Sequence, residues 1–230
     1  MIIRLNTGSR ASILILACLV LASVACAHRE KDVESNAPLE GIGTIAVIGF
    51  QPAALPHQQP GMVQNPLTRA LRYAEPAPQE AADQLTNSLF SRLARASGVD
   101  FIPPQAARSL VSAAETPFKA AGDLEIYSRI AESLSADAFL AGYIWRWNDR
   151  KGAEFAVESP ASVEFDLCLV RMHDKAVVWK YLYNKTQQSL AENFLDVKTF
   201  VKAKGRWLSA SELAELGLEE TVEAFPKRGE

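Results

Sequence analysis

The sequence has few cysteines and lacks a closely spaced group of metal-binding residues. Its 230 residues include Cys18, Cys26 and Cys168, and no Cys-x-x-Cys pair. The three histidines lie far apart in the chain, and none has a second ligand at the spacing that metal sites use. We therefore expect no disulfide framework, no metal site and no cofactor.

The sequence also lacks the usual catalytic motifs. It has no Gly-x-Ser-x-Gly and no phosphate-binding loop, and Gly41 and Gly43 precede a predicted strand, whereas a dinucleotide fingerprint follows one. Asp166 and Cys168 would share one face of a strand, but His173 lies about 16 Å further along an extended chain. That separation is too long for proton transfer. We interpret Cys168 as a structural residue and predict that the protein is not an enzyme.

An excess of positive charge is absent as well. The formal net charge is −3, and it becomes about −5 once Arg4 and Arg10 are removed with a signal peptide. Nucleic acids and anionic lipids both bind basic surfaces. We therefore exclude nucleic acid, and anionic lipid headgroups, as the main partner.

The one long apolar run covers residues 11–25, which is 15 residues. A helix that spans a bilayer needs roughly 20 residues, so a permanent transmembrane segment is the weaker interpretation. Two arginines precede the run, and small residues at its end lead into a cysteine, as in a signal peptide. We predict a signal peptide over residues 1–25.

The run ends at Ser23-Val24-Ala25-Cys26, which resembles a bacterial lipobox. This resemblance implies that Cys26 becomes the first mature residue and carries palmitate-type acyl chains, which anchor the protein to a membrane. An ordinary signal peptide with an incidental Cys26, an uncleaved anchor, and a second candidate at Cys18 are the alternatives. Ala27, by resemblance to Gram-negative lipoproteins, favours the periplasmic face of the outer membrane.

The remaining sequence predicts a polar tether over residues 26–42 and a single domain over residues 43–226. Within the domain, residues 51–78 contain six of the twelve prolines. Proline disfavours core elements, so this segment is interpreted as a long loop. Such loops are often functional, and the alternative is an irregular surface loop.

The pattern of apolar residues predicts an α+β fold with a mixed sheet of about five strands, helices packed on it and a helical C-terminal tail. A continuous apolar run over 44–50 predicts a strand buried on both faces. Helical spacing predicts helices over 79–97, 105–115 and 123–134, the last with Asp123 as its N-cap. Ser189 and Ser209 each begin a predicted capping box. Further strands are predicted over residues 100–103, 138–147, 163–171 and 177–184, the last two as an antiparallel hairpin.

The predicted strands carry an unusual set of aromatic residues. Because side chains alternate along a strand, the two tryptophans of residues 138–147 should share one face of that strand. The three aromatic residues of 177–184 should share one face of theirs. If these faces point outward, the set forms a platform for a protein or a glycan; if they point inward, it forms the core beneath the helices. The set consists of Trp145, Trp147, Trp179, Tyr181 and Tyr183.

Three segments resemble the TolB N-terminal domain and the CsgG-like and PelC-like bacterial lipoproteins. They are the strand at 44–50, the segment Leu134-Ser-Ala-Asp137 with the strand that follows, and the hairpin over residues 169–179. In this chain Gly49 stands where that group has a proline. Members of the group are accessory lipoproteins, some of which build export rings while others activate cell-wall synthases. The resemblance implies scaffolding and not catalysis.

The sequence thus predicts a non-enzymatic lipoprotein of the cell envelope, held to the membrane by lipid, that serves as an accessory or scaffold subunit of an export or cell-wall assembly complex. Its expected partners are envelope proteins, with self-association left open. The alternative is a module that binds a small ligand or a glycan through the aromatic face.

Overall fold

A computed structural model describes residues 39–96, 98–114, 122–153, 156–188 and 206–227. The predicted signal peptide and most of the predicted tether, including Cys26, lie outside these residues. So does the predicted capping box at Ser189. None of the helices in the described part of the chain is both long and apolar enough to cross a membrane.

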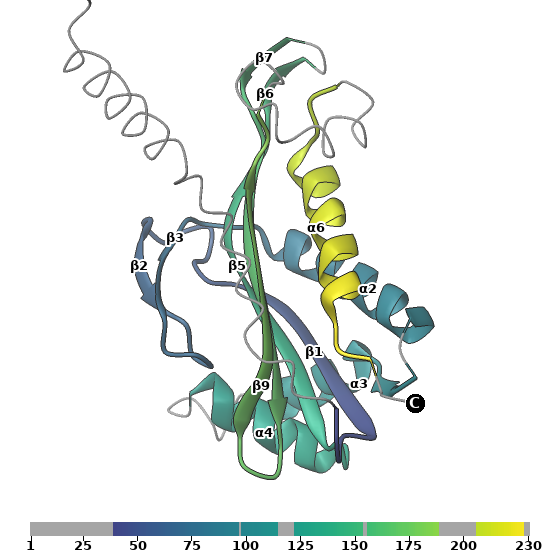
Figure 1. Ribbon diagram of the computed structural model, residues 1–230. Helices are drawn as coiled ribbons and strands as arrows, with labels where there is room; N and C mark the ends of the chain where they lie inside the picture. Colours follow the sequence, from purple (N-terminus) through teal and green to yellow (C-terminus); the bar gives the residue numbers. More distant parts are fainter. Residues whose placement is uncertain (1–38, 97, 115–121, 154–155, 189–205, 228–230) are drawn as a thin grey trace, which may run out of the picture. The chain divides into compact units, whose positions relative to one another are not determined.

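The described chain contains four helices and nine strands (Figure 1). The strands are β1 (Thr44–Pro52), β2 (Gly61–Gln64), β3 (Leu71–Ala74), β4 (Asp100–Ile102), β5 (Ala138–Asn148), β6 (Lys151–Ala153), β7 (Ala156–Ser159), β8 (Ser162–Arg171) and β9 (Ala176–Thr186). The helices are α2 (Gln79–Ala96), α3 (Pro104–Ala114), α4 (Asp123–Ser133) and α6 (Ala210–Ala224).

Five strands form the main sheet in the order β4-β1-β5-β8-β9. β1 runs parallel to β4 and β5, while β5, β8 and β9 pair antiparallel. This confirms the predicted α+β fold with a mixed five-stranded sheet. The predicted hairpin is also confirmed, because β8 and β9 are joined by the turn at residues 172–175.

β1 lies between β4 and β5 and is buried along most of its length, as its continuous apolar sequence predicts. Its first residues are held by Asp137, whose carboxylate accepts hydrogen bonds from the backbone N–H groups of Gly43 (2.9 Å) and Thr44 (3.0 Å). Its pairing with β5 shifts between Val47 and Gly49, where Gly49 has a φ of +92°. Proline, with φ fixed near −65°, cannot adopt this conformation.

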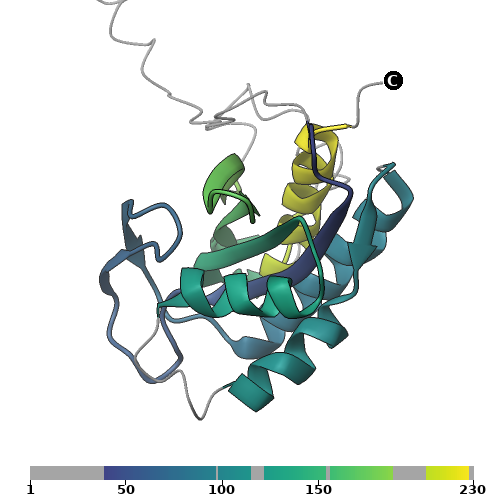
Figure 2. The same cartoon turned by 90° about the horizontal axis from the view of Figure 1, so that it is seen from below.

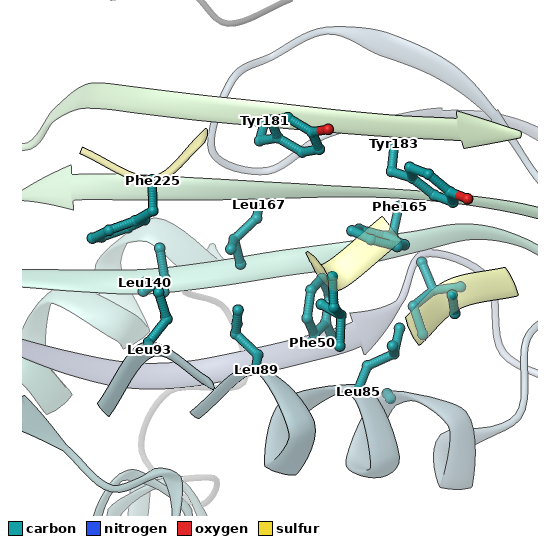
Figure 3. Packing of buried hydrophobic residues seen from close by; sticks show 14 of the residues in the cluster. Phe50, Leu85, Leu89, Leu93, Leu140, Phe165, Leu167, Tyr181, Tyr183 and Phe225 are labelled. Carbon is teal, nitrogen blue, oxygen red and sulfur yellow. The ribbon is translucent and has the colours of Figure 1, made fainter. Parts of the chain in front are cut away.

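Helices α2 and α6 cover one face of the sheet, which Figure 3 shows from close by. Leu85, Leu89 and Leu93 point from α2 toward the sheet and are almost fully buried. Burying each such side chain contributes roughly 1.5–3 kcal/mol to stability. The helical spacing predicted for residues 79–97 therefore describes the face of α2 that forms the core.

The other face of the sheet is covered by α3, α4 and the segment that carries β2 and β3. In Figures 1 and 2 this segment, drawn in blue, lies on the opposite side of the sheet from α6. The loop predicted over residues 51–78 is therefore wrong in part, because it contains an antiparallel hairpin. Its strands have four residues each, and contacts with the sheet hold them in place.

Two helix starts test the predicted caps. The capping box at Ser209 is confirmed, since Ser209 and Glu212 bond reciprocally at the start of α6. The predicted N-cap at Asp123 is wrong: Gly122 is the N-cap, without a side-chain hydrogen bond, and Asp123 is the first helical residue. The Asp123 carboxylate instead accepts a hydrogen bond from the Tyr143 hydroxyl at 2.6 Å.

Candidate functional site

The hairpin formed by β2 and β3 is closed by a turn that Asn65 organises. The Asn65 N–H donates to the Ala70 carbonyl (2.8 Å), and the Arg69 N–H donates to the Asn65 carbonyl (2.9 Å). The Asn65 side-chain oxygen accepts hydrogen bonds from the N–H groups of Leu67 (2.8 Å) and Thr68 (2.9 Å). Such bonds are the reason that asparagine favours turns.

Asn65 also joins this turn to the main sheet. Its side chain is fully buried, and its amide nitrogen donates to the Asp166 carboxylate on β8 at 2.7 Å. The other Asp166 oxygen accepts a hydrogen bond from the Tyr143 N–H at 3.2 Å. Burial raises the pKa of Asp166 to about 6, and the charge of Arg72 together with these hydrogen bonds limits the rise.

A second polar cluster is centred on Glu164, which lies two residues before Asp166 on β8. Glu164 is buried and accepts from Arg72 of β3 (3.3 Å) and from Arg146 of β5 (3.0 Å). Arg146 donates further hydrogen bonds to Ser162 and Asn184, both at 2.6 Å. Because these groups satisfy one another, the cluster holds the hairpin on the sheet and has no unpaired nucleophile or base.

A cavity of about 30 Å³ lies between the hairpin and the sheet, and its lining includes Arg72, Asp166, Cys168 and Lys180. Binding sites for small molecules usually have volumes of about 300–1,000 Å³. This cavity has room for a water molecule but not for a substrate.

The thiol of Cys168 lies in this region and is buried. Burial, and then the nearby charge of Asp166, raise the pKa of Cys168 well above its ordinary value. A protonated, buried thiol is a poor nucleophile. His173 is exposed in the turn between β8 and β9. The interpretation of Cys168 as a structural residue agrees with this burial.

Of the two interpretations of the aromatic set, the structure favours the core over an exposed platform. Four of its five side chains are buried and the fifth, Trp147, is half-buried. Trp179, Tyr181 and Tyr183 do share a face, as alternation predicts, but this face packs beneath α6 and Phe225. These three side chains belong to the core.

The expectation that Trp145 and Trp147 project from one face is wrong. The pairing of β5 with β8 shifts between Ile144 and Arg146, so Trp145 is the extra residue of a β-bulge. Trp145 belongs to the core cluster with α3 and α4, whereas Trp147 packs against the cluster with α2 and α6. Simple alternation fails here because the bulge adds one residue between them.

The exposed side of the hairpin is apolar, in contrast to the polar contacts beneath it. In the described part of the chain, the large apolar side chains that are exposed all come from this segment: Leu55 (41%), Met62 (63%), Leu71 (66%) and Tyr73 (55%). Cross-strand pairing places Met62 opposite Tyr73 and Gln64 opposite Leu71. We call the surface formed by Met62, Gln64, Leu71 and Tyr73 the hairpin outer face.

Sequence reasoning missed this surface. Two signals could have found it: the alternation of side chains on either side of the Asn65-Pro66 turn, and the charge pattern. No aspartate or glutamate occurs between Glu40 and Glu75, although the chain has 27 acidic residues.

Two further predictions concern the whole chain. Within the described residues, no group of three or more His, Cys, Asp or Glu side chains could hold a metal ion. The predicted lipidation residue, Cys26, lies outside the described residues and stays a prediction.

The chain matches no protein-family model, and comparison with curated proteins finds no relative. It is similar to several solved structures. One is the PelC dodecamer from Paraburkholderia phytofirmans, with a TM-score of 0.42 and 14% identity over 80% of this chain and 89% of that one. Another is the LpoB C-terminal domain from Salmonella enterica, with a TM-score of 0.38 and 13% identity over 64% of this chain and 84% of that one.

A third is lipoprotein GNA1162 from Neisseria meningitidis, with a TM-score of 0.38 and 14% identity over 70% of this chain and 92% of that one. PelC is among the groups that the sequence resembles, while the resemblance to TolB and CsgG stays a prediction. At this level of similarity, the function of the chain has to be argued from its own residues.

Proposed function

We propose that the protein is a non-enzymatic lipoprotein of the bacterial envelope that acts as an accessory or scaffold subunit by binding another envelope protein. Acyl chains on Cys26 would hold it to a membrane, and the domain would face the periplasm. Ala27 favours the outer membrane as its destination. This part of the proposal rests on the signal peptide and the lipobox.

The observation that carries the binding role is the gathering of exposed apolar side chains on the hairpin outer face. Single exposed apolar residues are common on soluble proteins, but a group on one surface marks an interaction site. Here Met62, Leu71 and Tyr73 are each more than half exposed on one small hairpin. The opposite side of the same hairpin is tied to the sheet through Asn65 and Arg72.

The glycan-binding alternative needs accessible aromatic side chains on the main sheet. Trp145, Trp179, Tyr181 and Tyr183 are all buried, so that alternative has little support from their positions. Catalysis also has little support, because the polar groups beneath the hairpin are paired with one another. The cavity beside them is too small for a substrate.

Two measurements test the proposal. Mass spectrometry of the protein from its native membranes should find acyl chains on Cys26, and the Cys26→Ser variant should leave the membrane fraction. A free thiol at position 26, or an intact N-terminal methionine, would contradict the anchor.

Native gel electrophoresis after mild solubilisation tests the binding role. The wild type should migrate in a larger complex, and the double variant Met62→Ser/Tyr73→Ser should be released from it. The matched control is Gln105→Ser, which changes an exposed residue on α3. Equal migration of all three proteins would contradict binding through the hairpin.

A further inference from the structure

The hairpin combines an apolar outer face with an exposed positive side chain in its turn. Alternation along β2 and β3 directs Met62, Leu71 and Tyr73 away from the domain, while Val63 and Arg72 lie on the side that contacts the sheet. Between Glu40 and Glu75 the chain has two arginines, Arg69 and Arg72, and no acidic residue. The hairpin segment itself therefore carries positive but no negative side chains, in a protein whose net charge is negative.

Arg69 supplies this positive charge at the end of the hairpin. It is exposed, lies in the turn with a φ of +64°, and has no acidic partner among the residues that the structure describes. Its carbonyl accepts a hydrogen bond from the Gln64 side chain at 3.1 Å. Arg72, in contrast, is paired with the buried Glu164. Arg69 is thus the charge that a partner can reach.

The hairpin is already held in position before a partner binds. Asn65 bonds to Asp166, and the N–H of Glu75 donates to the Trp145 carbonyl at 2.8 Å at the other end of β3. A surface that needs little ordering on binding loses less conformational entropy. Even a small contact can then contribute useful affinity, especially when a lipid anchor confines both partners to one membrane.

The composition of this surface indicates the kind of partner. Tyrosine, methionine and arginine are enriched at protein–protein interfaces, and opposite charges across an interface increase the association rate and the specificity. Segments that bind anionic membranes usually carry about four to eight Lys or Arg residues. One accessible arginine beside three apolar side chains fits a protein better than a lipid surface.

A second copy of this chain is a weaker candidate for the same reason. The acidic helix α6 is the obvious source of negative charge, but Glu215 is paired with Arg92 at 2.7 Å and Glu212 with Arg206 at 2.6 Å. Binding of either carboxylate to Arg69 of another copy would require its present ion pair to break. Glu223, near the end of α6, is exposed, so the identity of the adduct below has to exclude self-association.

We infer that the hairpin outer face binds an acidic segment of a different envelope protein, with a carboxylate placed on Arg69 and apolar side chains on Met62, Leu71 and Tyr73. This inference rests on the proposed function and adds the chemistry of the partner.

Photo-crosslinking in the cells that make the protein tests this inference. The full chain carries p-benzoylphenylalanine at position 73, which replaces an exposed aromatic residue by another, and the control carries it at position 105 on α3. We expect an adduct from position 73 only. The crosslinked peptide, identified by mass spectrometry, should come from another envelope protein and have a net negative charge.

Charge variants make the test specific. Arg69→Glu in the position-73 chain should reduce the adduct yield at least about five-fold, while Arg69→Lys should keep most of it. Both variants should have the thermal unfolding midpoint of the parent, because Arg69 is exposed. Equal yields from Arg69→Glu and the parent would overturn the inference.

Other outcomes contradict it directly. A lipid adduct would identify a membrane contact, an adduct with the same chain would identify self-association, and a neutral or basic peptide would remove the charge argument. Absence of any adduct from position 73 would also overturn it. The N-terminal peptide from the same samples reports on Cys26, so an acidic adduct with an unmodified Cys26 would support this inference while contradicting the proposed anchor.

Discussion

The side-chain amide of Asn65 donates a hydrogen bond to the carboxylate of Asp166 at 2.7 Å, and this bond joins a surface hairpin to the central part of the sheet. The same Asn65 side chain organises the turn between β2 and β3. One residue therefore controls both the shape of the hairpin and its attachment.

Replacement of Asn65 by alanine should destabilise the protein. It removes the hydrogen bonds to Leu67 and Thr68 and leaves a buried oxygen of Asp166 without its donor, which should cost about 2–4 kcal/mol. Urea unfolding of the mature chain measures this change, with Gln59→Ala, at an exposed position, as the control. A loss as small as that of the control would mean that the hairpin is held by other contacts.

Asp166 should make stability depend on pH. Its pKa is about 6 in the folded protein and near 3.8 ordinarily, so the folded state binds more protons between these values. Its contribution is therefore largest at low pH and is lost as the pH rises through 6, by about 3 kcal/mol in total.

Urea unfolding of the wild type and Asp166→Asn at pH 4 and at pH 6.5 isolates this effect. Asp174 and Glu212, whose pKa values are lowered to about 2, act in the opposite direction but are present in both proteins. The stability of the wild type relative to the variant should fall as the pH rises. A constant difference would show that Asp166 does not titrate in this range.

Gly49→Ala should be strongly destabilising. The φ of +92° is unfavourable for alanine, and an added Cβ would lie 2.3–2.9 Å from atoms of the Thr86 side chain. Thr86 cannot easily move away, because its hydroxyl accepts from the Phe50 N–H at 2.8 Å and donates to the Ala82 carbonyl at 2.7 Å. We expect a loss of at least about 2 kcal/mol, whereas Gly98→Ala, where no atom lies nearby, should change little.

Tryptophan fluorescence should distinguish the buried from the partly exposed indoles. Trp145 and Trp179 are almost completely buried, whereas Trp147 and Trp207 are half-buried. The double variant Trp147→Phe/Trp207→Phe should keep a blue-shifted emission that iodide barely quenches. Strong quenching of this variant would mean that Trp145 or Trp179 is accessible, and would favour the glycan-binding alternative again.

The parts of the fold that could be predicted are those whose structure is determined by residues close together in the sequence. The run from Ile45 to Phe50 predicts a buried strand because it has no polar side chain that could face water. Ser209 and Glu212 predict the start of α6 because their reciprocal bonds are local.

The parts that could not be predicted depend on contacts between distant residues. β2 and β3 are too short and too close to prolines to be recognised, and Asp166, which holds them, lies far away in the chain. Trp147 lies on the opposite side from Trp145 because a bulge, which no local pattern indicates, interrupts β5 between them. Asp123 has the right residue type for a cap, but Tyr143 binds its carboxylate instead.

The position of β1 has a consequence for biogenesis. Its residue Thr44 pairs with Asp100, and Ile45 pairs with Ala138, so the first strand of the domain cannot form its ladders until much of the chain has been made. Folding that waits for such distant partners is slow. Under the export that we propose, β1 would therefore spend time as an unpaired apolar strand, which would make the chain a client for holdase chaperones.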